Sequence, residues 1–227
     1  MIDLCHLDEA GFALTLPTTY SGCAQGQRLR VPSQAPQGRR VTVSGADLTH
    51  GPEAGRLEYR SWAMRPKSRG QKPRTPLEER AAAHGLTVDA GGPIDAERLV
   101  AFLWQVAGRP ADAAPTGRRG RPLVIALDNY SVHTSQTVVA AQPRLAAANV
   151  ELVYLARYCP EQSGIEPVWN DVKQHQIPMR SFEQVADLKH AVDDALACKA
   201  QHLQHAPGKS TNIQRLYLCG FRGGVEA

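Results

Sequence analysis

Three carboxylates stand at positions in the sequence where strands end or a helix begins. Asp8 follows the apolar end of the first strand-like segment, and Asp128 comes at the end of the apolar run "PLVIALDN". Glu166 lies between an isoleucine and a proline, where a helix is expected to start. Three converging carboxylates repel one another unless cations lie between them. The pattern therefore predicts that these residues hold two Mg²⁺ or Mn²⁺ ions, as in two-metal phosphoryl transfer.

Each of these carboxylates also has a purely structural interpretation. An Asp that follows a strand is commonly a turn or cap residue. Ser163 and Glu166 fit a Ser-x-x-Glu capping box, and Pro167 fits the first turn of a helix, where its missing N–H costs nothing. The capping box explains Glu166 locally, but it does not explain two further carboxylates at strand ends. Metal binding is the favoured hypothesis.

Three polar residues near these carboxylates are further candidates for the site. In "DNYSVHTS", Asn129 could hold a metal-bound water and His133 could orient a water or contact DNA. A turn asparagine and a histidine that caps the next helix are the alternatives. Lys173 could meet a phosphate, with a solvated helix lysine as its alternative.

Basic residues are unevenly distributed, although the formal net charge is only +4. The segment "RSWAMRPKSRGQKPR", residues 60–74 and here called the basic loop, carries six Lys or Arg and no acid. "GRRGRP", residues 117–122, adds three arginines. Both segments suit phosphate contacts, and solvated surface loops are the alternative. The predicted DNA contacts in the basic loop are Arg65, Lys67, Arg69 and Lys72.

The composition excludes several other classes of protein. With 227 residues, 42% of them hydrophobic, the chain can bury a sizeable core. Its five cysteines are scattered and never take a CxxC or Cys/His ligand spacing, which argues against a disulfide framework or structural zinc. No leader or membrane span is recognisable, and no nucleophilic Ser/His/Asp arrangement or phosphate-cradling glycine loop is present. We expect a cytoplasmic, nucleoid-associated protein without a membrane partner or a covalent enzyme intermediate.

The order of secondary-structure elements predicts how the carboxylates are positioned. Residues 2–16, 39–48 and 56–62 alternate as strands do and predict an antiparallel meander. Residues 122–129 and 150–156 predict two further strands. Helices are expected at 75–85, 95–108, 135–149, 165–176 and 181–203, with an interruption or kink at Pro143 and a capping box "SFEQ" opening the last helix. This order is typical of an α/β fold, in which a mixed five-stranded sheet carries helices on both faces.

With these motifs the chain resembles the catalytic domain of a DDE superfamily transposase of the insertion sequence 630 family, which is related to mariner-type elements. The segments that carry the resemblance, in order, are "LDEAGF", "RRVTVSGA", "LDNYSVHTS" and "YCPEQSGIEPVWNDVK". They place the family's two aspartates and terminal glutamate at Asp8, Asp128 and Glu166. The resemblance implies an RNase H-like fold in which Trp169 and Val172 pack the helix of Glu166 onto the sheet.

The resemblance also implies a DNA endonuclease that performs strand cleavage and strand transfer. Water would attack the phosphodiester at an element end, and the freed 3′-hydroxyl would attack target DNA. The implied partners are terminal inverted repeats, target DNA, a second copy of the chain in a homodimer, and a separate N-terminal transposase fragment. A helix-turn-helix DNA-binding domain, usual in the family, is expected to be absent. The expected organisation is a catalytic domain over 1–205, with a basic and helical insertion at about 62–95, and a C-terminal tail over 206–227.

Two departures from the family pattern leave other functions open. The family usually has an aromatic after "YS", where this chain has "YSGCAQG", and an Asn-Pro before "IE", where this chain has "QSGIE". Gly164 in place of a rigid proline predicts a looser approach to Glu166 and a lowered activity. The alternatives are an inactive or truncated remnant that only binds DNA or assembles, and an RNase H-like host nuclease.

Overall fold

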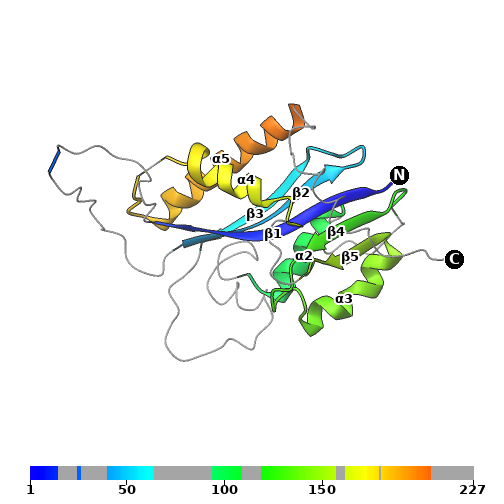
Figure 1. Cartoon of the computed structure of the whole chain (residues 1–227). Helices are drawn as coiled ribbons and strands as arrows, with labels where there is room; N and C mark the ends of the chain where they lie inside the picture. The colour runs from blue at the N-terminus through cyan, green and yellow to red at the C-terminus, as the bar shows by residue number, and fades with distance from the viewer. Residues whose placement is uncertain are drawn as a thin grey trace, which may run out of the picture.

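The computed structural model describes residues 1–14, 25–26, 40–63, 94–108, 119–156, 162–178 and 180–205. Its centre is a five-stranded sheet in the order β3-β2-β1-β4-β5 (Figure 1). The strands are β1 (Asp3–Ala13), β2 (Arg40–His50), β3 (Leu57–Ala63), β4 (Leu123–Leu127) and β5 (Val150–Tyr154). The expected helix at 75–85, most of the expected insertion at 62–95, and the tail at 206–227 lie outside the described residues.

The pairing of the strands confirms the mixed sheet. β1 pairs antiparallel with β2, and β2 pairs antiparallel with β3, so these strands form the expected meander. β1 also pairs parallel with β4, and β4 pairs parallel with β5. Parallel neighbours need a long connection, and helix α3 supplies it between β4 and β5.

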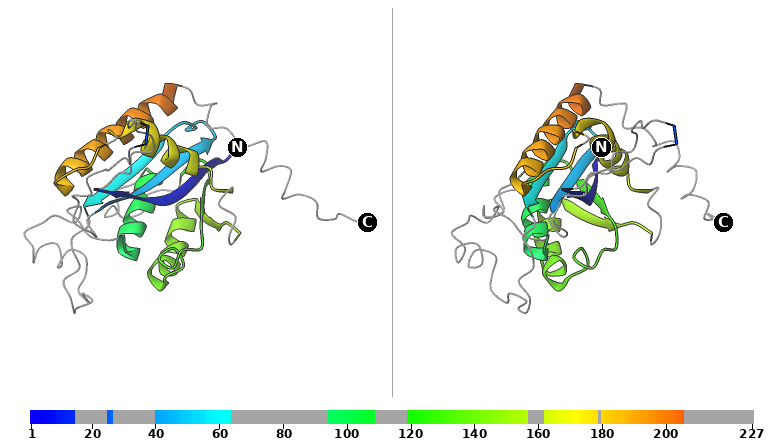
Figure 2. Two further views of the ribbon diagram at one scale, coloured as in Figure 1. Left: turned by 60° about the vertical axis from the view of Figure 1, so that its left-hand side comes forward. Right: turned by 90° about the vertical axis from the view of Figure 1, so that its left-hand side faces the viewer.

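Helices cover both faces of the sheet, as predicted (Figures 1 and 2). One face carries α2 (Ala96–Val106) and α3 (Gln136–Ala147). The other face carries α4 (Glu166–Asp171), its π-helical continuation η2 (Val172–Gln176), and α5 (Val185–His205). None of the helices in the described ranges is both long and apolar enough to cross a membrane.

The side chains of β1 alternate between the two faces of the sheet, and so contribute to two separate core clusters. Cys5 and Leu7 belong to the cluster beneath α2 and α3, whereas Ala10 and Phe12 belong to the cluster beneath α4 and α5. Successive side chains of a strand point to opposite faces. Asp8, at an even position between Leu7 and Glu9, therefore lies on the face that α4 and α5 cover.

The residues predicted to begin and end α2 have these roles in the structure. The Asp95 side chain caps α2 by accepting a hydrogen bond from the Arg98 N–H at 3.0 Å. Beyond the C-cap, Gly108 adopts a positive φ of 75°, which glycine tolerates without strain. The helix α3 contains Pro143 and continues through it, so the proline does not interrupt the helix.

The capping box expected at 181–184 is wrong, because α5 begins at Val185. Phe182 explains the later start. Its side chain is buried in the core cluster beneath α5, and its backbone N–H donates to the Leu14 oxygen at 2.9 Å. This segment is therefore bound to the end of β1 instead of forming the first helical turn.

Candidate active site

The strand register places Asp8 and Asp128 close to the point where β1 and β4 stop pairing. The parallel pairing of β1 and β4 ends at His6 and Ala126, and Asp8 and Asp128 each follow two residues later along the sequence. Asp128 follows the end of β4, as predicted. Asp8 does not follow the end of its strand, because β1 continues to Ala13 and Asp8 pairs with Gly45 of β2.

Glu166 reaches the same region as the first residue of α4. Burial raises the pKa of Asp8 from 3.8 to about 7. A backbone hydrogen bond at Glu9 opposes this rise, while the negative charges of Glu9, Glu166 and Asp128 add to it. Glu166 and Asp128 therefore both lie within electrostatic reach of Asp8.

The predicted capping box at Ser163 is not formed. The N-cap of α4 is Ile165 and makes no side-chain capping bond, and the Glu166 N–H donates to the backbone oxygen of Ser163 at 3.4 Å. Pro167 lies in the first turn, as predicted. The structural alternative for Glu166 therefore fails in its capping part, and the residue is exposed at the helix start.

Trp169 and Val172 pack α4 onto the sheet, which confirms the expectation for both residues. The indole lies against Gly45, where a Cβ atom would stand 2.7 Å from Trp169 Cζ2. Gly45 is the β2 partner of Asp8 in the antiparallel register. The helix that carries Glu166 is thus seated beside Asp8 because β2 lacks a side chain there.

Gly164, which precedes Glu166 by two residues, closely approaches His6. At Gly164, a Cβ atom would stand 2.8 Å from Cδ2 and 3.1 Å from Nε2 of His6. His6 is buried, and desolvation, followed by the charge of His50, lowers its pKa to about 4. The imidazole is therefore neutral at physiological pH. Gly164 therefore lies against the His6 ring, and the looser approach to Glu166 stays a prediction.

His133 joins Asp128 to a fourth carboxylate, Glu9. Its Nδ1 lies 2.8 Å from Asp128 Oδ1 and 3.1 Å from the Asp128 backbone oxygen. Its Nε2 lies 3.1 Å and 3.0 Å from the two carboxylate oxygens of Glu9. Both ring nitrogens thus face oxygen acceptors, so both donate and the ring is an imidazolium. The helix-capping alternative is wrong, because the N-cap of α3 is Ser135.

The charge of His133 agrees with its surroundings. Burial lowers its pKa, but the hydrogen bond and charge of Glu9, followed by the contacts with Asp128, raise it to about 9. The side chain is fully buried, whereas that of Asp128 is 58% exposed. Asp128 Oδ1 also accepts from the Tyr130 N–H at 2.9 Å, which leaves Oδ2 outside these bonds. The cluster orients Asp128 with one oxygen held by the protein.

Glu9 is the residue of this cluster that the sequence analysis missed. It follows Asp8 directly and therefore points to the opposite face of β1, toward the loop after β4. The available signal was the combination of adjacent acids in "LDEAGF" with a histidine in the loop after the second strand aspartate. Sequence alone does not pair them, because 124 positions separate Glu9 from His133.

The remaining candidates from the sequence are Asn129, Lys173 and the residues of the basic loop. The Asn129 amide donates to the Leu155 oxygen at 2.6 Å, and so ties together the segments that follow β4 and β5. The Lys173 ammonium lies 5.5 Å from the centre of the Phe12 ring, in a cation–π contact. Arg65, Lys67, Arg69 and Lys72, the predicted contacts in the basic loop, lie outside the described residues.

The two described arginines of "GRRGRP" fit neither of the interpretations made from the sequence. Arg119 and Arg121 form ion pairs with buried Asp3 at 3.0 Å and 3.4 Å. Both also reach Glu53, at 3.1 Å and 3.6 Å. Asp3 is the first residue of β1, five residues before Asp8. These arginines stabilise the far end of the sheet and are not free for phosphate.

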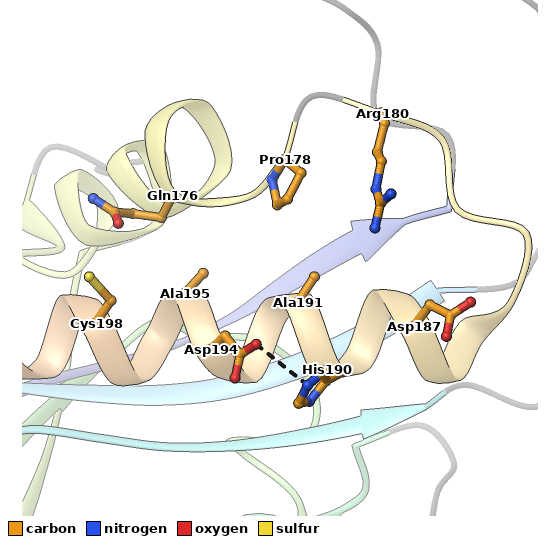
Figure 3. Close-up of a pocket in the computed structure, with 9 residues that line it drawn as sticks. All are labelled: Gln176, Pro178, Arg180, Asp187, His190, Ala191, Asp194, Ala195 and Cys198. Atoms are coloured by element: carbon orange, nitrogen blue, oxygen red, sulfur yellow. Dashed lines mark ion pairs between the residues drawn. The ribbon is translucent and has the colours of Figure 1, made fainter.

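A pocket of about 470 Å³ lies between the end of η2 and α5 (Figure 3). His190 and Asp194 face each other along α5 at 3.6 Å on its rim. Its lining residues are Gln176, Pro178, Arg180, Asp187, His190, Ala191, Asp194, Ala195 and Cys198. It therefore does not include Asp8, Asp128 or Glu166.

Comparisons with known proteins support this description. Residues 82–189, which include Asp128 and Glu166, match a family model described as DDE superfamily endonuclease. No curated protein matches the chain. Among solved structures, the Mos1 mariner paired end complex with Mn has 15% identity and a TM-score of 0.53, covering 91% of this chain and 53% of that one. The Mos1 strand transfer complex gives 15% identity and a TM-score of 0.51, covering 91% and 52%.

These likenesses differ in what they establish. The chain spans about half the length of the Mos1 chains that it matches. At this identity the solved structures show the fold alone, and the family model matches residues 82–189, just under half of the chain. The narrower assignment to the insertion sequence 630 family stays a prediction. The chain has the RNase H-like fold of the Mos1 transposase catalytic region, and its residues 82–189 are similar to the DDE superfamily endonucleases.

Proposed function

We propose that the chain is the catalytic part of a transposase, which cleaves DNA at the ends of an insertion sequence and transfers the strands to target DNA. The observation that supports the proposal is that the negative charges of Asp128 and Glu166 both act on the pKa of Asp8. The similarity of residues 82–189 to the DDE superfamily endonucleases supports the same reaction class.

Asp8, Asp128 and Glu166 are the residues proposed to hold two Mg²⁺ or Mn²⁺ ions. Their donor set consists of oxygen alone, which suits hard divalent cations. Burial, followed by the negative charges of its neighbours, raises the pKa of Asp8, and bound cations would favour the ionised carboxylate. In the described ranges, no three carboxylate, histidine or cysteine side chains are gathered closely enough to hold a metal as they stand. Binding therefore requires these side chains to draw together.

The chain's own part in the reaction is to hold these oxygens in place. His133 and the Tyr130 N–H fix Asp128 Oδ1, and Trp169 seats the helix that begins with Glu166. Bound metal ions would stabilise the attacking and leaving oxygens. In the proposed reaction, a water oxygen attacks phosphorus, and the bond from phosphorus to the 3′ oxygen breaks, which leaves a 5′-phosphate and a 3′-hydroxyl. The freed 3′-hydroxyl then attacks a target phosphorus, whose bond to its own 3′ oxygen breaks, so that the target's 3′-hydroxyl is the leaving group.

DNA is the proposed partner, as element ends and as target. The matched Mos1 structures are paired end and strand transfer complexes. The proposed phosphate contacts are Arg65, Lys67, Arg69, Lys72 and Lys173. A homodimer, a separate N-terminal fragment that reads the element ends, and a cytoplasmic location beside the nucleoid complete the proposal.

The test is nicking of supercoiled plasmid by the purified chain in Mn²⁺ or Mg²⁺, with EDTA as the blank. We expect metal-dependent nicking that Glu166→Gln lowers by roughly 100-fold or more, because this substitution removes a ligand charge. Glu151→Gln, at an exposed position on β5, is the matched control and should nick as the parent does.

Strand transfer is measured separately, by joining a duplex with a free 3′-hydroxyl to the plasmid. Joining by the parent chain and not by Glu166→Gln supports a transposase. Nicking without joining would instead favour the host nuclease. A parent chain that neither nicks nor joins in either metal would favour the inactive remnant.

A further inference from the structure

His6 and Gly164 form a contact that no catalytic role yet explains. A Cβ atom at position 164 would stand 2.8 Å, 3.1 Å and 3.1 Å from Cδ2, Cγ and Nε2 of His6. Ordinary van der Waals contacts of carbon atoms lie at about 3.5–4.0 Å. The imidazole ring is 4% exposed, so it has little room to move away. Only glycine fits over this ring at its present position.

Space, and not backbone conformation, is what demands glycine here. The described glycines with positive φ are Gly26, Gly51, Gly55 and Gly108, and Gly164 is not among them. An L-residue could therefore adopt the backbone of Gly164 if the ring were absent. A substitution at Gly164 therefore tests the steric contact with His6 without the backbone strain that often accompanies replacement of a glycine.

The contact connects the segments that carry two of the carboxylates. His6 lies two residues before Asp8 on β1, and therefore on the same face of the strand. Gly164 lies two residues before Glu166, and Ile165 between them is buried as the N-cap of α4. The contact at Trp169 and Gly45 seats α4 on the other side of Glu166. The helix start is thus held on both sides.

We propose that His6 and Gly164 are a positioning pair, in which the buried ring sets the height of the loop before α4 and hence the place of Glu166 relative to Asp8. The inference rests on the proposed function, because it assigns a role toward the metal ligands of that site. Neither residue touches DNA or the reacting atoms in this assignment. Their effect passes through the backbone between Gly164 and Glu166.

The pair can be tested with a double-mutant cycle in the full chain. The variants are Gly164→Ala, His6→Ala and the double variant, measured below their melting temperatures. Gly11→Ala is the matched control, because Gly11 lies on the same strand and a Cβ there meets nothing within 4 Å. The readouts are the plasmid nicking rate, the Mn²⁺ concentration for half-maximal nicking, and direct Mn²⁺ binding from the signal of the free ion.

A methyl group at position 164 must displace the loop by roughly half an ångström to reach normal contact. A misplacement of about 1 Å can cost about 100-fold in rate, so we expect Gly164→Ala to nick roughly tenfold more slowly. It should also need more Mn²⁺ and bind Mn²⁺ more weakly. The double variant makes room for the methyl group and should recover at least roughly tenfold over the product of the single effects.

Recovery of Mn²⁺ binding in the double variant, with Gly11→Ala like the parent, supports the positioning role. Loss of thermal stability in Gly164→Ala with parental nicking and Mn²⁺ binding would overturn it, since the contact would then serve packing alone. An active parent with additive single effects would also overturn this inference alone. A parent that neither nicks nor binds Mn²⁺ would overturn the proposed function, and this inference with it.

Discussion

Replacing Asp8 by asparagine should stabilise the metal-free protein while abolishing cleavage. Burial, followed by the negative charges of Glu9, Glu166 and Asp128, raises the pKa of Asp8 to about 7. Asparagine keeps the shape of the side chain and removes the charge. The substitution therefore removes the cost of burying a charge and the repulsion in the folded state, and it removes a proposed metal ligand at the same time.

The size of the effect follows from the shift in the pKa of Asp8. A pKa raised from 3.8 to about 7 in the folded protein means that the stability contributed by this carboxyl is present below about pH 4 and is lost as pH rises through 7. At about 1.36 kcal/mol per pKa unit, the loss is at most about 4 kcal/mol. Solvent screening reduces this value, because the residue is partly exposed. Asp8→Asn lacks the loss, so its advantage over the parent should grow between pH 4 and pH 8.

The assay is urea unfolding in EDTA at a series of pH values, for the parent and Asp8→Asn. Glu151→Gln is the control for removing an exposed carboxylate and should follow the parent. Adding Mn²⁺ should stabilise the parent more than Asp8→Asn, since ligands that bind the folded state stabilise it. A free energy of unfolding that differs between parent and variant by the same amount at every pH would refute the reasoning.

Three further predictions concern Asp128, Glu9 and the basic loop. Asp128→Ala should leave the fold and DNA affinity nearly intact while plasmid cleavage falls by orders of magnitude, and equal cleavage by mutant and parent would contradict the assignment. Glu9→Gln should destabilise the protein by roughly 1–3 kcal/mol near neutral pH and slow cleavage, because His133 loses its charged partner. The pKa of His133 is raised from 6.5 to about 9, so its full contribution to the free energy of unfolding is present below pH 6.5 and is lost as pH rises through 9. In urea unfolding, the stability of Glu9→Gln should therefore approach that of the parent above pH 9. Alanine at the four predicted contacts of the basic loop should weaken binding about equally for all duplexes and flatten the salt dependence by up to roughly 0.9 log units per lost contact, whereas an unchanged slope would return the loop to a solvated surface.

The sequence was sufficient for the features that depend on local patterns. Alternating and continuous apolar runs predicted the five strands, and the cap at Asp95 with the glycine at 108 predicted the limits of α2. Asp128 and Glu166 were found because they stand at a strand end and at a helix start. Asp8 was expected at a strand end as well, but antiparallel pairing with β2 extends β1 to Ala13, so Asp8 lies within the strand.

The sequence was misleading where a local motif competed with long-range contacts. "SFEQ" is a good capping box, but burial of Phe182 and its bond to Leu14 hold that segment outside the helix. The arginines of "GRRGRP" suit phosphate by composition, yet buried Asp3 needs their positive charge. For "SFEQ", the tertiary contact outweighs a capping preference that is worth only about 1 kcal/mol.

Two features of the site were decided by the tertiary structure alone. The bond between Glu9 and His133 joins residues 124 positions apart, on different elements. The fit of Gly164 over His6 depends on how closely α4 approaches β1. Sequence patterns fix which face of a strand or helix a residue occupies, because the periodicity is a local property of the backbone. The distance between two elements depends instead on the side chains packed between them, and only the folded chain determines those contacts.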